Sequence, residues 1–441
     1  MEEENFKVLV VSHNAFSKIY NNGKTLESIF LDIPKENIAQ IFFSQNEYPD
    51  YEFCNNYFKI TDKDVLKNIF YPKKFGAILD VKTDDKIQKI EEQISTRSKI
   101  WKLLKSISSH IVILRDYLWK FNSWNTKKLS QWIDSFNPSI VFYYGGNAGF
   151  SHDIAIHIKK KYKLPLAVFF SDDYLINPID RNFIDKLHKR RMRYFFANTV
   201  DNASVCFAIG DLMAAEYSDY FGKQFYPIMN SIDIKPYVYK QNLSNVITIR
   251  YFGGLHLKRW KMISRLGKVI KEINENTVEN RIKFILEVYS TTKLNHTIID
   301  SFNENCVDFK GSINGSELEK KMTDSDILLH VESDDEYYRS LTKLSVSTKI
   351  PEYLISGRCV VAYGPSEVAS IRILSDNHIG YVISSEDIFE DIKIKLLKIL
   401  QSPSLRISLG QKGYDYAVKV FNAEAIRKNF MLRLKNVINN H

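Results

Sequence analysis

The chain has 441 residues, which is too long for one ordinary hydrophobic core and predicts two domains. Hydrophobic residues make up 44% of the sequence and charged residues 26%, a balance that is typical of globular proteins and excludes extensive disorder. The net charge of +9 favours an anionic partner, such as a nucleotide, a nucleic acid or an anionic lipid surface.

The four cysteines have neither metal-ligand nor redox spacing, which favours a reducing compartment. The first residues are acidic, so we do not expect a signal peptide. No apolar run approaches the ~18 residues that are needed to span a bilayer. We therefore expect a cytoplasmic protein, and peripheral attachment to the inner face of the cell membrane is left open.

Short apolar runs alternate with helical patterns through the first half of the sequence. Runs that are apolar at nearly every position are typical of parallel strands covered by helices on both faces. The alternation therefore predicts a doubly wound α/β domain. We expect strands at residues 7–12, 38–44, 57–60, 140–144, 166–170 and 204–209, and helices at 23–30, 151–161 and 212–221.

The pattern breaks between residues 226 and 246, where Pro227, Asn230 and Pro236 fall in a stretch without helical periodicity. A second alternation of strands and helices follows it. We expect strands at 246–252, 282–289, 307–310, 326–331, 359–363 and 380–383, helices at 261–274, 317–322 and 349–356, and a mostly helical tail at 389–439.

This organisation predicts an α/β protein with two Rossmann-like domains that face a central cleft, a common place for a ligand. We assign residues 1–228 to the N-terminal domain, 229–245 to a linker and 246–420 to the C-terminal domain. A last helix at 421–441 completes the chain, and its return to the N-terminal domain is left open.

The polar loop Ser345-Val346-Ser347-Thr348 enters a predicted helix at Lys349. The free backbone N–H groups and the dipole of such a helix start suit a diphosphate, and Lys349 adds a positive charge. Glu352, one turn later, could accept hydrogen bonds from both hydroxyls of a ribose. The alternative is a capped helix with an exposed glutamate.

The stretch from Glu352 to Ala362 resembles the donor-site signature of the retaining family 4 glycosyltransferases, of the bacterial surface-polysaccharide type. In that family two glutamates, separated by seven residues, precede a helix, a glycine and a strand. Glu352 matches the second glutamate, whereas Leu344 stands in place of the first and Cys359 in place of a usual proline. The resemblance implies the GT-B fold and a donor site in the C-terminal domain.

Residues 252–260 resemble the family's glycine loop, which is followed by a cation on the donor diphosphate. Gly253 and Gly254 would let the backbone approach the donor closely. The resemblance assigns the cation to Arg259, with Lys258 as the second choice, and places Phe309 beside the base. The alternative for the two cations is a solvated basic turn.

In the N-terminal domain, the segment Asn22-Gly23-Lys24-Thr25 resembles the glycine loop that faces donor and acceptor in GT-B enzymes. Asp172 follows a strand at a place where many relatives carry a polar pair, and we predict that it lies near the reacting acceptor. An ordinary helix cap and an ordinary strand-to-loop turn are the respective alternatives. His13 and His152 are weaker candidates, because a lone histidine is more often structural.

Two segments, Arg97–Lys128 and Phe183–Phe196, combine many basic residues with aromatic ones, including Trp101, Trp119 and Trp124. Basic amphipathic helices with tryptophan can lie in the headgroup region of an anionic membrane. The alternative is a solvated face whose aromatic residues belong to the core. No motif for nucleic-acid recognition accompanies the charge, so we expect no nucleic-acid partner.

The sequence as a whole predicts a glycosyltransferase that moves a sugar from a nucleotide-diphosphate donor to a glycan or lipid-linked acceptor. The resemblance implies transfer with retention, without a metal or a cofactor, in the synthesis of cell-surface polysaccharide. Two alternatives stay open: a sugar-nucleotide epimerase with the GT-B fold, and a non-catalytic module that binds a nucleotide-sugar or a membrane.

Overall fold

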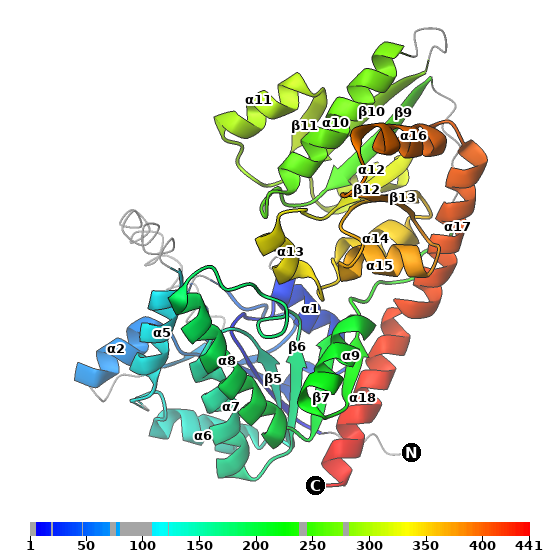
Figure 1. The fold of residues 1–441 in the computed structure, drawn as a ribbon. Coiled ribbons are helices and arrows are strands. Elements are labelled where there is room, and N and C mark those ends of the chain that lie inside the picture. The colour runs from blue at the N-terminus through cyan, green and yellow to red at the C-terminus, as the bar shows by residue number, and fades with distance from the viewer. Residues whose placement is uncertain are drawn as a thin grey trace. The chain divides into compact units, whose positions relative to one another are not determined.

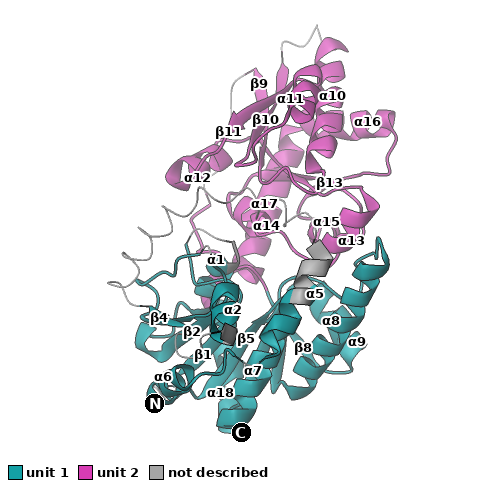
Figure 2. Cartoon of the chain, turned by 90° about the vertical axis from the view of Figure 1, so that its left-hand side faces the viewer, with its two compact units in different colours: residues 1–228, 425–441 teal, residues 229–424 magenta. Residues whose placement is uncertain are grey.

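The computed structural model describes residues 6–18, 21–45, 47–70, 76–79, 108–121, 123–237, 245–276 and 282–441. The chain divides into two compact units (Figure 2). Unit 1 comprises Met1–Ile228 and Ala425–His441, and unit 2 comprises Met229–Glu424. Each unit is built on its own sheet, so each is described by itself.

The sheet of unit 1 has the strand order β4-β3-β2-β1-β5-β6-β7-β8. Figure 1 labels its strands β5, β6 and β7. All of its neighbouring strands are parallel except β3 and β4. The strands are β1 (Val8–Ser12), β2 (Ile38–Phe42), β3 (Asn56–Lys59), β4 (Ala77–Leu79), β5 (Ile140–Gly145), β6 (Leu166–Phe170), β7 (Val205–Ile209) and β8 (Phe225–Ile228). The helices are α1 (Asn21–Phe30), α2 (Asp62–Phe70), α5 (Ser108–Trp119), α6 (Lys127–Phe136), α7 (Gly149–Tyr162), α8 (Phe183–Asn202), α9 (Gly210–Phe221) and α18 (Ala423–Asn439).

The C-terminal helix α18 packs on the sheet of unit 1. The ring of its Phe430 lies 5.3 Å from that of Phe30, 5.6 Å from Phe142 and 5.4 Å from Phe207, measured between centroids. Edge-to-face aromatic contacts of this kind stabilise a core beyond the area they bury. The end of the chain is therefore part of the first unit's core.

The sheet of unit 2 has the order β11-β10-β9-β12-β13-β14, and all of its strands are parallel. The strands are β9 (Val246–Phe252), β10 (Lys283–Tyr289), β11 (Val307–Gly311), β12 (Ile327–Val331), β13 (Cys359–Gly364) and β14 (Tyr381–Ser384). The helices are α10 (Arg259–Asn276), α11 (His296–Glu304), α12 (Gly315–Thr323), α13 (Glu336–Thr342), α14 (Lys349–Ile355), α15 (Ala369–Asp376), α16 (Phe389–Leu400) and α17 (Pro403–Val420).

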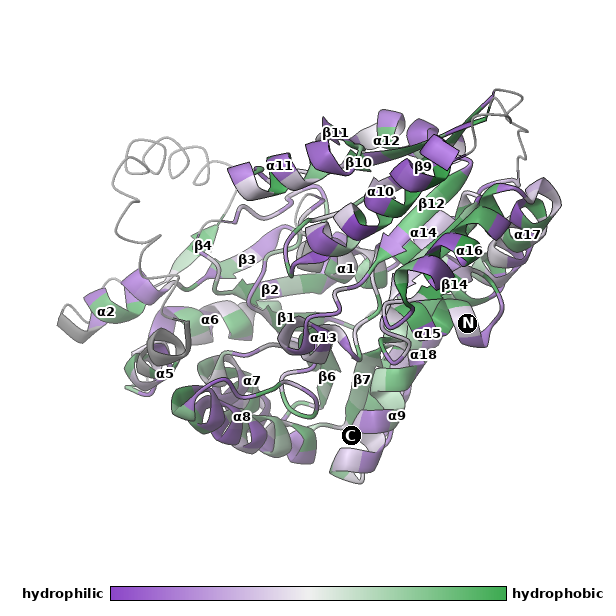
Figure 3. Cartoon of the chain, turned by 45° about the horizontal axis from the view of Figure 1, so that its top comes forward, coloured by the Kyte–Doolittle hydropathy of each residue, from purple (hydrophilic) through white to green (hydrophobic). Residues whose placement is uncertain are grey.

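The predicted α/β class with two doubly wound domains is confirmed. Strands β2 and β12 are buried at every position, and both are largely hydrophobic in Figure 3. Strand β8 was not predicted, because the pattern of strands and helices was expected to break from residue 226. Pro227 is accommodated there because β8 is an edge strand, where a missing N–H costs little.

The sequence reading did not predict the short helices α11, α13 and α15. Two of them carry a helix-start signal, since the side chain of Asn295 accepts a hydrogen bond from the Ile298 amide and that of Asp335 from the Tyr338 amide. These helices have fewer than ten residues, too few for a clear apolar period. Among the described residues, no helix is long and apolar enough to cross a membrane.

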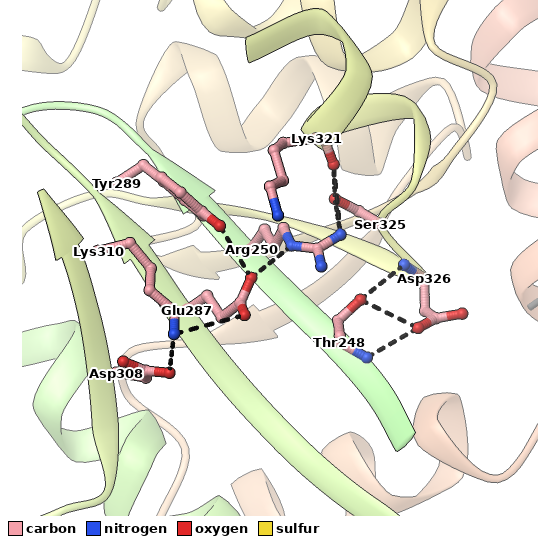
Figure 4. A network of polar contacts seen from close by, with 9 residues as sticks. All are labelled: Thr248, Arg250, Glu287, Tyr289, Asp308, Lys310, Lys321, Ser325 and Asp326. Carbon is pink, nitrogen blue, oxygen red and sulfur yellow. Dashed lines mark hydrogen bonds and ion pairs between the residues drawn. The ribbon is translucent and has the colours of Figure 1, made fainter. Parts of the chain in front are cut away.

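On one face of the sheet in unit 2, strands β9, β10 and β11 carry a polar network (Figure 4). Arg250, which is buried, donates from Nε to a carboxylate oxygen of Glu287 at 2.6 Å and from Nη1 to the Lys321 carbonyl at 3.4 Å. Tyr289 donates its hydroxyl to the same carboxylate at 3.1 Å. A buried charge is tolerated only when it is paired and hydrogen-bonded, and this network supplies both conditions.

Candidate functional site

The strand order of unit 2 reverses its direction between β9 and β12. The chain runs outward from β9 through β10 to β11 and then returns to the other side of β9. In open parallel sheets, ligands bind outside the carboxyl ends of the strands at such a switch point. This rule predicts a ligand site at the segments that follow β9 and β12, together with the loop that enters α14.

The turn after β9 has an unusual backbone. A side chain at Gly253 would place its Cβ 2.8 Å from the hydroxyl oxygen of Tyr251, so the close approach requires glycine. Leu257 and Lys258 both have a positive φ, of 58° and 60°. Non-glycine residues in this region are strained and cluster at functional sites. The turn leads directly into α10, whose first residue is Arg259.

Arg259 lies at the switch point and is held by a carboxylate from the neighbouring strand. Its Nη2 lies 2.9 Å from Oε2 of Glu332, the residue that follows β12, and the side chain of Glu332 is 2% exposed. The Nε2 atom of His330 lies 3.1 Å from the other carboxylate oxygen. Within the described part of the chain, Nε of Arg259 is buried without a hydrogen-bond partner.

The Arg259–Glu332 pair stays ionised over a wide pH range. Burial by itself raises the pKa of Glu332, but the charge of Arg259 and the neighbouring His330 ring outweigh it and hold this pKa at about 2. Sequence reasoning did not select Glu332 as a site residue. The sequence signal for Glu332 was a carboxylate placed directly after an entirely buried strand.

The second predicted cation, Lys258, forms an ion pair with a different carboxylate. Its Nζ lies 2.5 Å from a carboxylate oxygen of Asp335, the N-cap residue of α13. Both side chains are partly exposed, at 43% and 25%. An exposed pair of this kind is weak and can be exchanged for a ligand at little cost. Arg259 is therefore the fixed cation of the turn, and Lys258 is the adaptable one.

The loop Ser345–Thr348 is anchored before α14 begins. The amide of Ser347 donates to the Ser370 hydroxyl at 2.9 Å, and the amide of Ser345 donates to the Thr342 carbonyl at 3.1 Å. The amide of Lys349 donates to the Ser347 hydroxyl at 3.3 Å. Part of the amide set that we predicted to hold phosphate is thus engaged within the protein. The bonds to Ser370, on α15, fix the position of the loop.

Helix α14 is tied to the end of β9 by Tyr353. Its hydroxyl accepts from the amide of Phe252 at 2.9 Å and donates to the carbonyl of the same residue at 3.1 Å. Lys349 and Glu352, on the same helix, form an ion pair at 2.6 Å, and both are partly exposed. The structure therefore brings the glycine turn and the α14 segment together, and it pairs the predicted phosphate cation with the predicted ribose acceptor.

Two other positions from the sequence analysis, Leu344 and Phe309, pack in or against the hydrophobic core. Leu344, where the family's first glutamate would stand, is fully buried in the core, so its side chain offers nothing to a sugar. Phe309 lies on β11, the edge strand, and packs against the hydrophobic core of unit 2. No contact joins Phe309 to Arg259 or Glu352 among the interactions that the structure describes, and its predicted role beside the base stays a prediction.

In unit 1, Asp172 follows the carboxyl end of β6 in a chain of hydroxyl groups. Tyr144 donates to Ser171 at 2.6 Å, Ser171 donates to Oδ2 of Asp172 at 3.1 Å, and Tyr174 donates to the same oxygen at 3.4 Å. Burial raises the pKa of Asp172, and these hydrogen bonds offset it only in part. Asp173 instead caps the following turn through three backbone amides and is structural.

Gly23 lies inside the first turn of α1, and a Cβ there would fall 2.6 Å from the Ala15 carbonyl oxygen. His152 is fully buried, with its ring nitrogens 2.8 Å from the Thr199 hydroxyl and 3.0 Å from the Gly146 carbonyl. Burial lowers its pKa to about 4. His152 is therefore a core histidine with a partner for each ring nitrogen, which agrees with the expectation that a lone histidine is more often structural.

No protein-family model matches the chain, and no curated protein does. Three solved structures are similar over nearly their full length. HepE from Anabaena, in complex with UDP-glucose, has a TM-score of 0.60 and 11% identity, over 97% of this chain and 99% of its own. TarM has a TM-score of 0.60 and 12% identity over all of both chains. The α,α-trehalose 6-phosphate synthase from Burkholderia multivorans has a TM-score of 0.60 and 10% identity over 99% of both.

This chain has the GT-B fold. The expected fold is thereby confirmed for the chain as a whole. At 10–12% identity the likeness is one of fold, so the roles of individual residues rest on the geometry of this chain. Within the described residues, no group of three or more His, Cys, Asp or Glu side chains is arranged to hold a metal ion.

Proposed function

We propose that this protein is a glycosyltransferase that uses a nucleoside-diphosphate sugar as its donor. The proposal is supported by the strained glycine turn and the largely buried Arg259 at the switch point of unit 2, and by helix α14, which Tyr353 ties to the end of β9. The likeness to HepE, which holds UDP-glucose, supports the same ligand class on the same fold.

The chemistry that this arrangement suits is departure of a diphosphate. As the bond between the sugar carbon and the diphosphate oxygen breaks, negative charge grows on the leaving group. A cation fixed in low-dielectric surroundings stabilises that charge without reorganisation, which is the role we assign to Arg259. We assign the ribose hydroxyls to Glu352 and a second diphosphate contact to Lys349 and Lys258. No step in this scheme calls for a metal.

Retention follows from the resemblance of the donor segment to family 4. In the proposed step, the acceptor hydroxyl forms the new bond to the sugar carbon, and its proton passes to the leaving diphosphate. Asp172 would lie beside that hydroxyl as a polar group rather than as a strong base. A glycan or lipid-linked acceptor in cell-surface polysaccharide synthesis, on the cytoplasmic side of the membrane, completes the proposal.

A donor screen tests this function. We expect one or a few nucleoside diphosphates, added to the full chain, to raise its thermal midpoint, and the matching nucleotide-sugar to release diphosphate faster when an acceptor is present. Interconversion of donor sugars without an acceptor would indicate an epimerase instead. Binding of a donor without transfer or hydrolysis for any glycan or lipid-linked acceptor would indicate a binding module.

A further inference from the structure

Helices α5 and α8 form an exposed ridge on unit 1, where they pack on each other and on α7 (Figure 1). Aromatic side chains protrude from it, with Phe183 78%, Phe121 71%, Tyr194 67% and Tyr117 52% exposed. Single exposed apolar residues are ordinary, but aromatic residues gathered on neighbouring helices mark an interaction surface. We call these residues, with the cations described below, the α5–α8 ridge.

For Trp119 and Trp124, the alternative that the aromatic residues belong to the core is the one that agrees with the structure. Trp119 is buried, stacks on Phe150 with 4.0 Å between ring centroids, and donates to Asp62 at 2.8 Å. Trp124 is buried as well. Residues 80–107, including Trp101, lie outside the described residues. The exposed rings belong to phenylalanine and tyrosine instead.

A groove of about 610 Å³ runs between the two helices. Its lining combines rings and cations, among them Tyr117, Lys120, Arg190, Arg191 and Tyr194. One carboxyl, Asp153, also lines it, and burial raises the pKa of that carboxyl to about 6. The lining holds three cations, Lys120, Arg190 and Arg191, against this one carboxyl, so the groove is predominantly cationic near neutral pH.

The groove has a rigid wall because Arg191 joins the two helices. Its guanidinium lies 4.8 Å from the Tyr117 ring centroid and 5.9 Å from that of Phe195, and it pairs with the buried Asp116 at 3.4 Å. Arg191 is thus occupied by packing. Lys120, Lys186, Arg190 and Arg193 are exposed and direct the positive charge outward, and α8 is mostly hydrophilic in Figure 3.

We propose that the α5–α8 ridge docks on the surface of an anionic phospholipid bilayer. Basic helices bearing aromatic rings settle at the boundary between headgroups and acyl chains, where cations meet phosphates and rings enter the apolar layer. The exposed rings of Phe183 and Phe121 have no polar atom to offer a nucleic-acid backbone. A symmetric pairing of two copies through this face would set cation against cation, so a second copy is disfavoured.

Co-sedimentation of the full chain with vesicles tests whether the exposed cations of the α5–α8 ridge bind anionic lipids. We expect binding at low salt to vesicles that contain phosphatidylglycerol and much weaker binding to pure phosphatidylcholine. The double variant Arg190→Glu/Arg193→Glu should weaken binding at least about tenfold. The matched control is Lys428→Glu/Lys435→Glu, on two exposed positions of α18, which changes the net charge equally and should retain most of the binding.

A second measurement separates insertion from simple adsorption. In Phe183→Trp, a tryptophan replaces the most exposed ring, and its emission should shift to the blue and be quenched by brominated lipids when vesicles are added. Equal loss of binding in both charge variants, or no shift in Phe183→Trp while DNA competes for the protein, would overturn the proposal. So would a failure of the wild-type chain to bind phosphatidylglycerol vesicles at low salt. This inference goes beyond the proposed function, and neither test measures sugar transfer.

Discussion

Near the carboxyl ends of the two sheets, burial affects the ionisation of side chains in opposite ways. In unit 2, Arg259 and Glu332 are desolvated together and stay ionised, with the pKa of Glu332 held at about 2. In unit 1, burial lowers the pKa of His13 and of His152 to about 4 and raises that of Asp172. The same cost of desolvation is offset by an opposite charge in one unit and favours the neutral form in the other.

This difference fits two different ligands. A permanent cation at the switch point of unit 2 suits a diphosphate, whose charge rises during transfer. Neutral polar groups at the sheet edge of unit 1 suit an uncharged hydroxyl acceptor, because they offer hydrogen bonds without a competing ion.

The largest effect is expected for Arg259→Ala. Losing the fixed cation should lower kcat/KM for the donor by about 10²–10³-fold, because the charge of the leaving diphosphate is then unopposed. Steady-state kinetics with the donor found in the screen measure it. Lys261→Ala, which removes an exposed cation two residues further along α10, is the control and should change kcat/KM little.

Glu332→Gln should lower the free energy of unfolding, because it removes a charge inside unit 2. It leaves the largely buried Arg259 without its counter-charge, which we expect to cost about 2 kcal/mol in the free energy of unfolding. Urea denaturation at neutral pH measures that cost. Asp335→Asn, which breaks the partly exposed pair with Lys258, should shift the midpoint far less. Equal shifts would show that the buried pair has no special role.

Glu352→Ala should weaken donor binding by roughly tenfold, because the hydroxyls of a ribose lose a charged acceptor. Isothermal titration with the nucleoside diphosphate reports the change directly. Glu317→Ala, at an exposed position of α12, is the matched control. If the two variants bind alike, Glu352 is only the exposed partner of Lys349.

The smallest effect concerns pH and Asp172. Its pKa is raised by burial, so it stays protonated to a higher pH than an exposed aspartate does. If the neutral carboxyl holds the acceptor hydroxyl, kcat/KM should fall as pH rises through this raised pKa, and Asp172→Asn, which stays neutral, should be at most a few times slower and lack that fall. An unchanged alkaline limb in the variant would assign the titration to another group.

The strands were predictable because a continuous apolar run has few alternatives to a buried parallel strand. Runs such as that of β6 or β13 needed no tertiary information. The glycine turn and α14 could be found from residue types and order. Their joining could not, because the hydroxyl of Tyr353 meets the backbone of Phe252 across 101 residues.

The pairing of charges was also hidden in the sequence. Arg259 and Glu332 are 73 residues apart, and only the strand order β9-β12 makes them neighbours. The same holds for Trp119, whose burial depends on packing against Phe150 from another helix. A basic aromatic segment gives the composition of a surface, whereas the fold decides which rings face outward.

The most direct test of the central claim is a structure of the chain with the nucleoside diphosphate that the donor screen selects. We predict that the diphosphate lies within hydrogen-bond distance of the Arg259 guanidinium, beside the glycine turn and the start of α14. A diphosphate bound elsewhere, with the switch point of unit 2 unoccupied, would contradict the account.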